Sequence, residues 1–295
     1  MAADSDLHLF GEDILDPYGG AFKVTRGLST RFPDRVHTTP ISESGIVGVA
    51  AGMALRGKPA IVEIMFGDFL GLAMDQLLNH AAKMPWMYDE QVEMPLIVRT
   101  PMGGGRGYGP THSQSLEKHF CGIPGLTVLA VDQFADLPAL YRAAHAARQP
   151  TLIIENKVLY ARMMAGADAL PSPPSPEILL IAYGGSVELA LAAAERLQEE
   201  EFSVAVLPIR TLSPFPVDQV RAAAAGCRNV LVVEEGSIGW GFAESCARAL
   251  IGTPVRFDSI AGGDHPIPSS RAWEQRVLPS VEAVIAAASR LLGVA

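Results

Sequence analysis

Three side chains of this sequence have the type and the setting for acid–base chemistry: Glu12, Glu43 and His112. Glu43 opens an apolar stretch with helical period, and a carboxyl group in a dry cleft has a raised pKa that lets it exchange a proton with a ligand. His112 follows the glycine-rich run 103–110, whose backbone can approach a ligand closely. Each residue also has a plainer interpretation. A carboxylate favours the first turn of a helix, Glu12 can be a solvated loop acid, and a single loop histidine usually lies at the surface.

Signatures of other chemistries are incomplete or missing. The run 103–109 does not satisfy the G-x-G-x-x-G spacing, and the sequence contains neither a G-x-x-x-x-G-K-[ST] phosphate loop nor a G-x-S-x-G elbow. The cysteines form no Cys-x-x-Cys pair, which argues against a zinc ribbon and a disulfide framework. His112 and His119 are seven residues apart, a poor spacing for two metal ligands on one helix. We predict no metal site within this chain.

The composition favours a soluble, cytoplasmic globular protein. Hydrophobic residues make up 49% and charged residues 19% of the 295 residues, which is enough for a buried core. The formal net charge of -9 argues against a nucleic-acid-binding protein, which normally presents a basic surface. The apolar run 44–55 is shorter than the roughly 20 residues that span a bilayer. Asp4 and Asp6 make the N-terminus unlike a secretory signal, so we expect no membrane association.

Strand-length apolar runs alternate with stretches of helical period in the first half of the chain. Strands are predicted at 7–10, 60–64, 96–100, 127–131 and 151–155, and helices at 43–55, 68–84 and 134–147. The first helix has an i, i+3, i+4, i+7 stripe of Ile46, Val49, Ala50 and Met53. Such alternation predicts an α/β fold with a mostly parallel sheet covered on both faces.

A proline-rich stretch, Pro171-Ser-Pro-Pro-Ser-Pro176, divides the chain. After it, strands are predicted at 178–183, 204–209 and 230–234, and helices at 187–198, 217–225 and 242–250. Ser280 can cap a final helix, and one apolar face of that helix carries Val281, Val284, Ile285, Ala288 and Leu292. We predict one domain over 1–160, a linker over 161–176 and a second domain over 177–295.

Nine segments follow one another in the order and at the spacing of one known family. They are Gly11-Glu-Asp13, Gly19-Gly-Ala-Phe-Lys-Val-Thr25, Thr39-Pro-Ile-Ser-Glu-Ser-Gly-Ile-Val-Gly48, Glu63-Ile-Met-Phe-Gly-Asp-Phe69, Met74-Asp-Gln-Leu-Leu-Asn-His-Ala-Ala-Lys83, Gly105-Arg-Gly-Tyr-Gly-Pro-Thr-His-Ser-Gln-Ser115, Ile209-Arg-Thr-Leu-Ser-Pro214, Val233-Glu-Glu235 and Leu278-Pro-Ser280. Together they resemble the β subunit of pyruvate and branched-chain 2-oxo-acid dehydrogenases. Several motifs in register are more specific than any single one, and they run nearly from end to end.

The resemblance implies a transketolase-like fold, in which a pyrimidine-binding domain precedes a smaller C-terminal α/β domain, and thiamine diphosphate as cofactor. In the family the cofactor sits between α and β subunits, and the α subunit supplies the magnesium and diphosphate site through Gly-Asp-Gly and a later Asn. This chain contains neither Gly-Asp-Gly nor Asn-Asn, so we expect another chain to provide the oxygen ligands. The implied assembly is an α2β2 heterotetramer that passes an acyl unit to a lipoyl-bearing transacylase.

The resemblance also assigns roles to individual residues. Glu43 matches the glutamate that hydrogen-bonds the aminopyrimidine ring and promotes deprotonation of the thiazolium carbon. Glu12 matches a second acid near the cofactor, while Met65 and Phe69 match residues that contact and stack on the ring. His112 matches the histidine that is thought to handle protons during acyl transfer. The implied catalytic residues are therefore Glu43 and His112, and the implied cofactor-binding residues are Glu12, Glu43, Met65 and Phe69.

Some positions depart from the family pattern. The family commonly reads Met-Ser-Gly-Gly-Gln where this chain has Met87-Tyr-Asp-Glu-Gln91, which adds bulk and negative charge. Some relatives hold a potassium ion, and the matching positions here lack a carboxylate; they are Leu96, Ala144, Ala147 and Gln149. His80 and His119 are weaker site candidates, and we expect them to be structural.

These departures keep two other functions open. One is a transketolase-like subunit that moves a two-carbon unit from a ketose or keto acid to a carrier protein in specialised biosynthesis. This subunit would share the thiamine chemistry and differ in donor and acceptor. The other is a non-catalytic subunit that serves only as a scaffold, for which loss of Glu43 or His112 would be the signal. Both residues are present.

Overall fold

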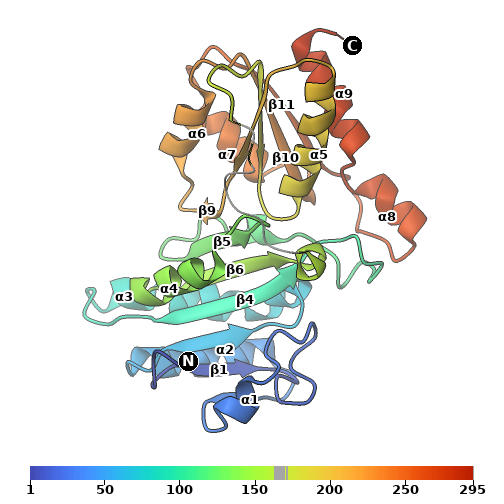
Figure 1. Ribbon diagram of the computed structural model, residues 1–295. Helices are drawn as coiled ribbons and strands as arrows, with labels where there is room; N and C mark the ends of the chain where they lie inside the picture. The colour runs from blue at the N-terminus through green and yellow to red at the C-terminus, as the bar shows by residue number, and fades with distance from the viewer. Residues whose placement is uncertain (163–169, 171, 295) are drawn as a thin grey trace. The chain divides into compact units, whose positions relative to one another are not determined.

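The computed structural model describes residues 1–162, 170 and 172–294, which form two compact units (Figure 1). The first unit comprises residues 1–102, 120–129 and 136–155, and the second comprises 103–119, 130–135 and the chain from Asn156 onward. Neither unit is one continuous block of sequence. The domain bounds 1–160 and 177–295 therefore stay a prediction, and the linker 161–176 lies partly outside the described residues.

The first unit is built on a sheet with the strand order β2-β1-β3-β4-β6-β5. The pairings that join β2, β1, β3 and β4 are parallel. Every residue of β4 is buried, as expected for a central strand covered on both faces. The strands are β1 (His8–Gly11), β2 (Val36–Thr38), β3 (Ala60–Glu63), β4 (Leu96–Met102), β5 (Thr127–Val131) and β6 (Thr151–Asn156).

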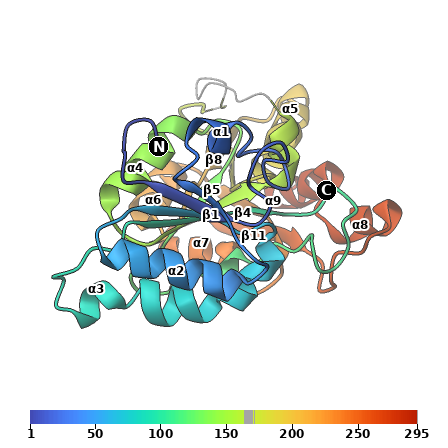
Figure 2. The same cartoon turned by 90° about the horizontal axis from the view of Figure 1, so that it is seen from below.

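Helices cover both faces of this sheet (Figure 2). The helices α2 (Glu43–Leu55) and α3 (Met84–Met87) lie on one face, and α1 (Leu28–Arg31) and α4 (Leu137–Ala147) lie on the other. Helix α4 begins three residues later than predicted. The Asp136 carboxylate accepts a hydrogen bond from Ala139 N at 2.9 Å and so fixes the start of the helix.

Helix α2 has the predicted bounds, but its buried face differs from the predicted stripe. Ile46 and Ala50 are buried as expected, whereas Val49 is 58% exposed and Val47 is fully buried instead. The reason is compositional. The sequence of this helix is apolar on every side, so the spacing of apolar residues cannot select the face that meets the sheet.

The predicted helix over 68–84 is wrong as a single α-helix. The segment folds as a 3-10 helix (Gly67–Ala73), a π-helix (Gln76–Ala81) and the short α3. Gly71 lowers helix propensity within the segment. At its end Gly125 packs against the main chain, and a Cβ atom at Gly125 would lie 2.2 Å from the carbonyl oxygen of Ala82. Tertiary contact therefore overrides the helical period here.

The second unit contains a parallel four-stranded sheet with the order β11-β10-β7-β8. The strands are β7 (Ile178–Ala182), β8 (Val204–Pro208), β10 (Asn229–Ser237) and β11 (Arg256–Gly262), with β9 (Thr211–Ser213) outside this sheet. Helices α5 (Ser186–Glu199) and α9 (Val281–Leu292) pack together over one face, and α6 (Val217–Ala224) and α7 (Phe242–Ala249) lie on the other side (Figure 1).

The final helix α9 confirms the prediction made for its cap and its face. Ser280 Oγ accepts a hydrogen bond from Ala283 N at 3.2 Å. Val284 and Ala288 belong to the buried core of the second unit, with Val281, Ile285 and Leu292 partly buried against it. Among the described residues, no helix combines the length and the apolar character that a membrane crossing requires.

Candidate functional site

The strand order of the first unit creates a natural place for a ligand. The chain leaves β1 toward β2 on one side and then crosses to β3 on the other side of β1. In parallel α/β sheets, ligands bind at such a switch point, outside the carboxyl ends of the strands. Glu12 directly follows β1, Glu43 begins the helix after β2, and Met65 and Phe69 follow β3. The topology thus brings the predicted cofactor residues to one edge of the sheet.

Glu12 and Glu43 form a pair of buried acids. Glu12 is 6% exposed and Glu43 is 4% exposed. Burial raises the pKa of Glu12, and the nearby carboxylates of Glu43 and Asp13 raise it further. The Oε1 atom of Glu12 is buried and has no hydrogen-bond partner among the described residues. A buried, unpaired acceptor of this kind is costly, which indicates a site built to meet a polar ligand.

Met65 and Phe69 lie in the turn after β3 and are both half-buried. The rings of Phe66 and Phe69 meet edge to face, with centroids 6.0 Å apart, and Phe22 meets Phe66 in the same way at 5.9 Å. Edge-to-face packing holds aromatic rings in defined orientations. The turn therefore offers an ordered, partly open apolar surface to a planar ring.

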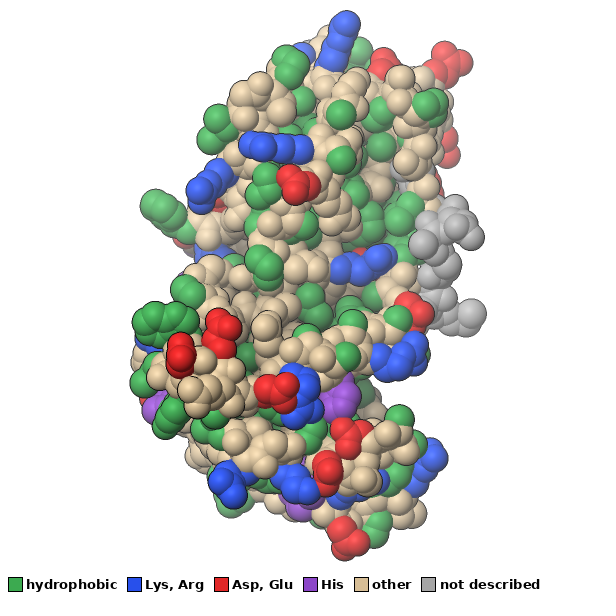
Figure 3. All heavy atoms as spheres, turned by 90° about the vertical axis from the view of Figure 1, so that its left-hand side faces the viewer, with side chains coloured by type: hydrophobic (Ala, Val, Ile, Leu, Met, Phe, Trp, Pro, Cys, Tyr) green, Lys and Arg blue, Asp and Glu red, His purple; other side chains and the backbone are tan. Residues whose placement is uncertain are grey.

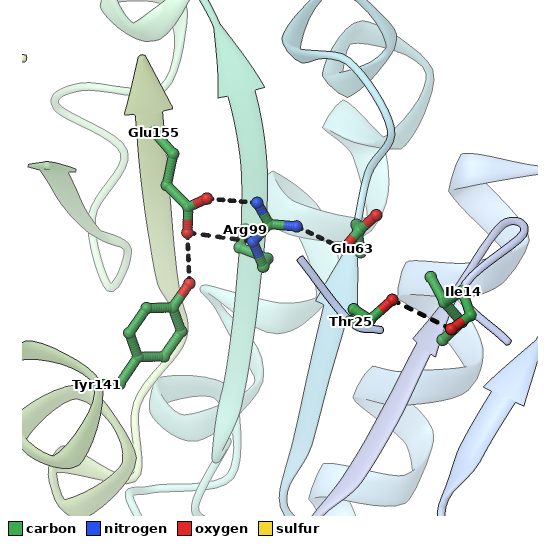
Figure 4. Close-up of polar contacts among 6 residues, drawn as sticks. All are labelled: Ile14, Thr25, Glu63, Arg99, Tyr141 and Glu155. Atoms are coloured by element: carbon green, nitrogen blue, oxygen red, sulfur yellow. Dashed lines mark hydrogen bonds and ion pairs between the residues drawn. The ribbon is translucent and has the colours of Figure 1, made fainter. Parts of the chain in front are cut away.

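A buried ionic network stands beneath this turn (Figure 4). The Arg99 guanidinium on β4 pairs with Glu63 on β3 and with Glu155 on β6, and its Nε lies 3.1 Å from Glu155 Oε1. Tyr141 OH donates to the same Glu155 oxygen at 2.6 Å. Burial raises the pKa of Glu63, an effect that the charge of Arg99 opposes. The network ties together three neighbouring strands just before they reach the candidate site.

The loop after Glu12 closes over this network. Gly20 has φ +79°, and a Cβ atom at that position would lie 2.5 Å from Glu63 Oε1. The loop is held in turn by Thr25, whose hydroxyl donates to the carbonyl of Ile14 at 3.1 Å (Figure 4). Only glycine allows both the left-handed backbone and the close approach at position 20.

His112 belongs to the second unit, on the loop that follows the glycine-rich run. It is half-buried, and its Nδ1 lies 2.9 Å from the hydroxyl of Thr111. The buried ammonium of Lys157 donates to the carbonyl oxygen of His112. Lys157 also lies over the ring of Tyr108, at 5.6 Å from its centroid. The backbone at His112 is therefore fixed while its imidazole remains accessible.

Two carboxylates hold the glycine-rich run in place. Glu235 Oε1 accepts from Gly104 N at 2.6 Å, and Glu274 Oε1 accepts from Gly105 N at 2.8 Å. Gly107 N also donates to Glu274, at 3.2 Å from Oε2. Glu274 is 2% exposed, and its carboxylate accepts hydrogen bonds from backbone N–H groups. Such bonds to a charged acceptor are strong.

Sequence reasoning missed Arg99, Glu155, Glu235 and Glu274 as site components. A charged residue inside the apolar run of β4 was a signal for Arg99, because a buried charge requires partners. His80 is half-buried, with its Nε2 3.4 Å from Asp75 Oδ2, and His119 is exposed; their structural role stays a prediction.

The site residues of the first unit suit a flat, nitrogen-containing ring. They supply a protonatable acid with an unpaired buried oxygen, a second acid beside it and an aromatic surface. Such a set can hold a proton against a ring nitrogen and stack on the ring face. Over residues 1–162, 170 and 172–294, no group of three or more His, Cys, Asp and Glu side chains is arranged to hold a metal ion.

Comparison with known families assigns both parts of the chain. Residues 1–163 match the family described as the pyrimidine binding domain of transketolase. Residues 167–284 match the family described as the C-terminal domain of transketolase. The chain is also similar to a solved split-gene transketolase, an inactive β4 tetramer, with a TM-score of 0.78 over 99% of this chain and 94% of that one. At 19% identity, this likeness concerns the fold alone.

Relatives of known function cover almost the whole chain. The pyruvate dehydrogenase E1 component subunit beta-1 of Arabidopsis thaliana is 32% identical over 98% of this chain and 85% of its own length. The E1 subunit beta of Rickettsia bellii is 31% identical over 99% and 94%. The beta subunit of acetoin:2,6-dichlorophenolindophenol oxidoreductase from Cupriavidus necator is 31% identical over 99% and 93%.

Proposed function

Because this chain belongs to the transketolase-like family that includes the β subunits of the pyruvate dehydrogenase E1 component, we propose that it is the β subunit of a thiamine-diphosphate-dependent 2-oxo-acid dehydrogenase. Such an enzyme decarboxylates a 2-oxo acid and transfers the acyl unit to a lipoyl acceptor. The observation that supports it within the molecule is the pair Glu12 and Glu43 at the switch point, with a buried oxygen of Glu12 left for a ligand.

The chain's own residues have distinct tasks in this proposal. Thiamine diphosphate, when bound, supplies the electron sink that decarboxylation requires. Glu43 is 4% exposed and would hold a proton at the aminopyrimidine ring, where a carboxyl group can both give and take it. Glu12 turns its free oxygen toward the same ring, and Phe69 offers the stacking surface. The side of the site that this chain contributes is thereby ordered.

His112 acts at a later stage in the proposal. Its backbone is fixed by Lys157, and the run before it is fixed by Glu235 and Glu274, so the imidazole is presented in one place. One ring nitrogen of a neutral imidazole donates a proton and the other accepts one, which suits the side chain to proton transfer. We assign it to proton transfer during passage of the acyl unit to the acceptor.

The partner completes the site in this proposal. We propose that an α subunit supplies the magnesium ion and the diphosphate ligands and that the assembly is an α2β2 heterotetramer. The acceptor is a lipoyl-bearing transacylase, and the cytoplasmic location remains a prediction. The name of the Cupriavidus relative includes acetoin, so membership of the family does not specify which donor the enzyme uses.

The test combines the chain with its α subunit. The chain alone is expected to show no turnover and weak binding of thiamine diphosphate in calorimetry, and the α subunit should restore both. Pyruvate, branched-chain oxo acids, acetoin and a ketose phosphate serve as donors, with an artificial electron acceptor as readout. Robust turnover by the purified chain alone would refute the proposal. Turnover only with the ketose would favour the two-carbon transferase instead.

A matched pair of variants ties the activity to the site. Glu12→Ala should weaken binding of the cofactor by the complex, because it removes the buried Oε1 atom that is left for a ligand. Asp13→Asn changes the adjacent exposed acid, which contributes least to the raised pKa of Glu12, and serves as the control. Equal affinity in all three proteins would remove Glu12 from the cofactor site.

A further inference from the structure

A concave pocket of about 510 Å³ lies in the second unit, where β10 and β11 begin. Arg221, Arg228 and Arg256 line it, and no acidic residue does. They come from three different parts of the unit: helix α6, the residue before β10 and the first residue of β11. The volume is within the range of small-molecule sites, about 300–1,000 Å³.

None of the three guanidinium groups is neutralised by a carboxylate among the described residues. Arg221 Nε donates to the carbonyl of Ala249 at 2.7 Å, and Arg256 Nη2 donates to the carbonyl of Arg290 at 3.3 Å. These neutral acceptors orient the two side chains and leave their charges uncompensated. The side chain of Arg228 makes no hydrogen bond or ion pair with the described chain, and all three side chains are exposed to solvent.

Three arginines elsewhere in the same unit are paired with acids. Arg210 lies 2.8 Å from Asp132, Arg290 lies 3.5 Å from Asp258, and Arg196 lies 3.5 Å from Glu282. In this pocket, by contrast, three arginines gather without an acid in the lining, in a protein whose formal net charge is -9. Like charges gathered in one concavity repel one another, and an anion in the concavity offsets that repulsion.

The surroundings extend the positive character. A neighbouring hollow of about 410 Å³ shares Arg221 and adds Arg248, again with no acid in its lining. The face of the second unit that carries α6 and α7 shows basic side chains set among hydrophobic and uncharged atoms, together with acidic ones (Figure 3). The positive lining therefore continues from the pocket into the neighbouring hollow.

The remaining lining is small and apolar. Ala224 and Val255 form part of it, and Gly226 has φ +81° with open space where a side chain would stand. Cys227 also lines the pocket, but burial raises the pKa of its thiol, which donates to the carbonyl of Asn229 at 3.1 Å. The thiol is therefore neither a nucleophile nor a metal ligand here.

We propose that this pocket binds a small phosphorylated molecule, with its phosphate groups held by Arg221, Arg228 and Arg256. The planar guanidinium fork matches phosphate oxygens in pairs, and three forks suit a ligand with two or three negative charges. The apolar lining and the open space at Gly226 receive the rest of the ligand. This assignment is independent of the thiamine chemistry proposed above.

The pocket is also separate from the loop that carries His112. Strand β10 begins at Asn229, beside the pocket, and Glu235, which holds the glycine-rich run, lies six residues further along it. At about 3.3 Å per residue, the two places stand roughly 20 Å apart. Substitutions in the pocket therefore leave the anchors of the glycine-rich run in place.

The test is a calorimetric titration of the full-length chain with inorganic pyrophosphate, which needs no turnover and no partner. We expect saturable binding with a dissociation constant between about 10 μM and 1 mM, weakening as salt is added. Arg228→Gln and Arg256→Gln should each weaken binding about tenfold or more, since each removes a charge-assisted contact. Arg196→Gln, an exposed arginine of the same unit outside the pocket, is the matched control.

Three results would overturn the proposal. The first is an absence of saturable binding in the wild-type chain at about 10 mM pyrophosphate, well above the weakest expected dissociation constant. The second is an equal loss of affinity in Arg196→Gln and Arg228→Gln, which would indicate non-specific attraction. The third is tighter, Arg228-dependent binding of hexaglutamate than of pyrophosphate, which would make the occupant an acidic chain segment. Unchanged melting temperatures of the variants establish that they are folded.

Discussion

Removal of the charge on Arg99 should cost this protein a large part of its stability. In Arg99→Met the apolar side chain fills similar space, but Glu63 and Glu155 lose the cation that pairs with both of them (Figure 4). Arg99 is 5% exposed at its side chain, Glu63 4% and Glu155 11%, so water cannot replace the guanidinium. Breaking a buried ion pair by removing one partner costs about 3–5 kcal/mol. The free energy of unfolding of a typical protein is only about 5–15 kcal/mol.

The loss of stability in Arg99→Met should grow as pH rises. Burial raises the folded-state pKa of Glu63 above its usual value of 4.5, and Arg99 opposes that shift. A carboxyl group with a raised folded-state pKa stabilises the fold at low pH and loses that contribution as pH rises through the folded-state value. Without Arg99 the pKa of Glu63 rises further. The variant should therefore lose more stability than the wild type between about pH 5 and about pH 8.

Urea unfolding followed by circular dichroism measures both effects. Arg148→Met is the matched control, because Arg148 and Glu93 form a largely exposed pair worth about 0–1 kcal/mol. Adding Glu63→Gln and Glu155→Gln to Arg99→Met should recover part of the loss, since it removes the unpaired charges. Two results would contradict this expectation. One is a loss in the free energy of unfolding below about 1 kcal/mol for Arg99→Met at pH 8, and the other is an equal loss at about pH 5 and about pH 8.

Three further expectations concern other parts of the chain. Glu90 has φ +57°, where the family commonly has glycine, so Glu90→Gly should raise the free energy of unfolding by about 0.5–1 kcal/mol in urea titration, while Gln91→Gly should not. Burial raises the pKa of Glu117 to about 7, so wild-type stability should fall by an amount on the order of 3 kcal/mol between about pH 5 and about pH 8, and Glu117→Gln should flatten that part of the profile; an unchanged slope would count against the burial of this acid. His112→Ala should slow acyl transfer more than decarboxylation in single-turnover kinetics of the complex, and Glu274→Gln should do the same to a smaller degree, with faster hydrogen exchange at Gly105 and Gly107. Equal losses in both steps would remove His112 from transfer.

Much of the fold follows from local sequence features. Helix α2 begins at Glu43, where a long apolar stretch starts, although Ser42 before it makes no capping hydrogen bond through its side chain. Helix α9 begins after Ser280 because the serine hydroxyl satisfies a free N–H group of the first turn. Strands β2 and β9 were not predicted, because three residues are too few to show a period. Strand β11 was missed because its mixed sequence, Arg-Phe-Asp-Ser-Ile-Ala-Gly, is half-buried rather than apolar.

For the candidate site too, some residues could be predicted from the sequence and others could not. Glu12, Glu43, Met65 and Phe69 stand in short motifs next to strands, so the resemblance could name them as cofactor residues, and the topology brings them to one edge of the sheet. The anchors of the glycine-rich run did not stand out, because the contact of Glu235 with Gly104 spans 131 residues and that of Glu274 with Gly105 spans 169. No periodicity or spacing rule connects residues so far apart. Their pairing is set by the tertiary fold of the second unit.

The most direct test of the central claim follows the proton that Glu43 is proposed to control. Hydrogen–deuterium exchange at the thiazolium carbon of thiamine diphosphate is measured by quenched-flow NMR in the complex of this chain with its α subunit. We expect fast exchange in the wild-type complex and exchange slowed by about 100-fold or more in Glu43→Gln, with the cofactor still bound. Equal exchange rates in the two loaded complexes would contradict the role of Glu43 and the site built around it.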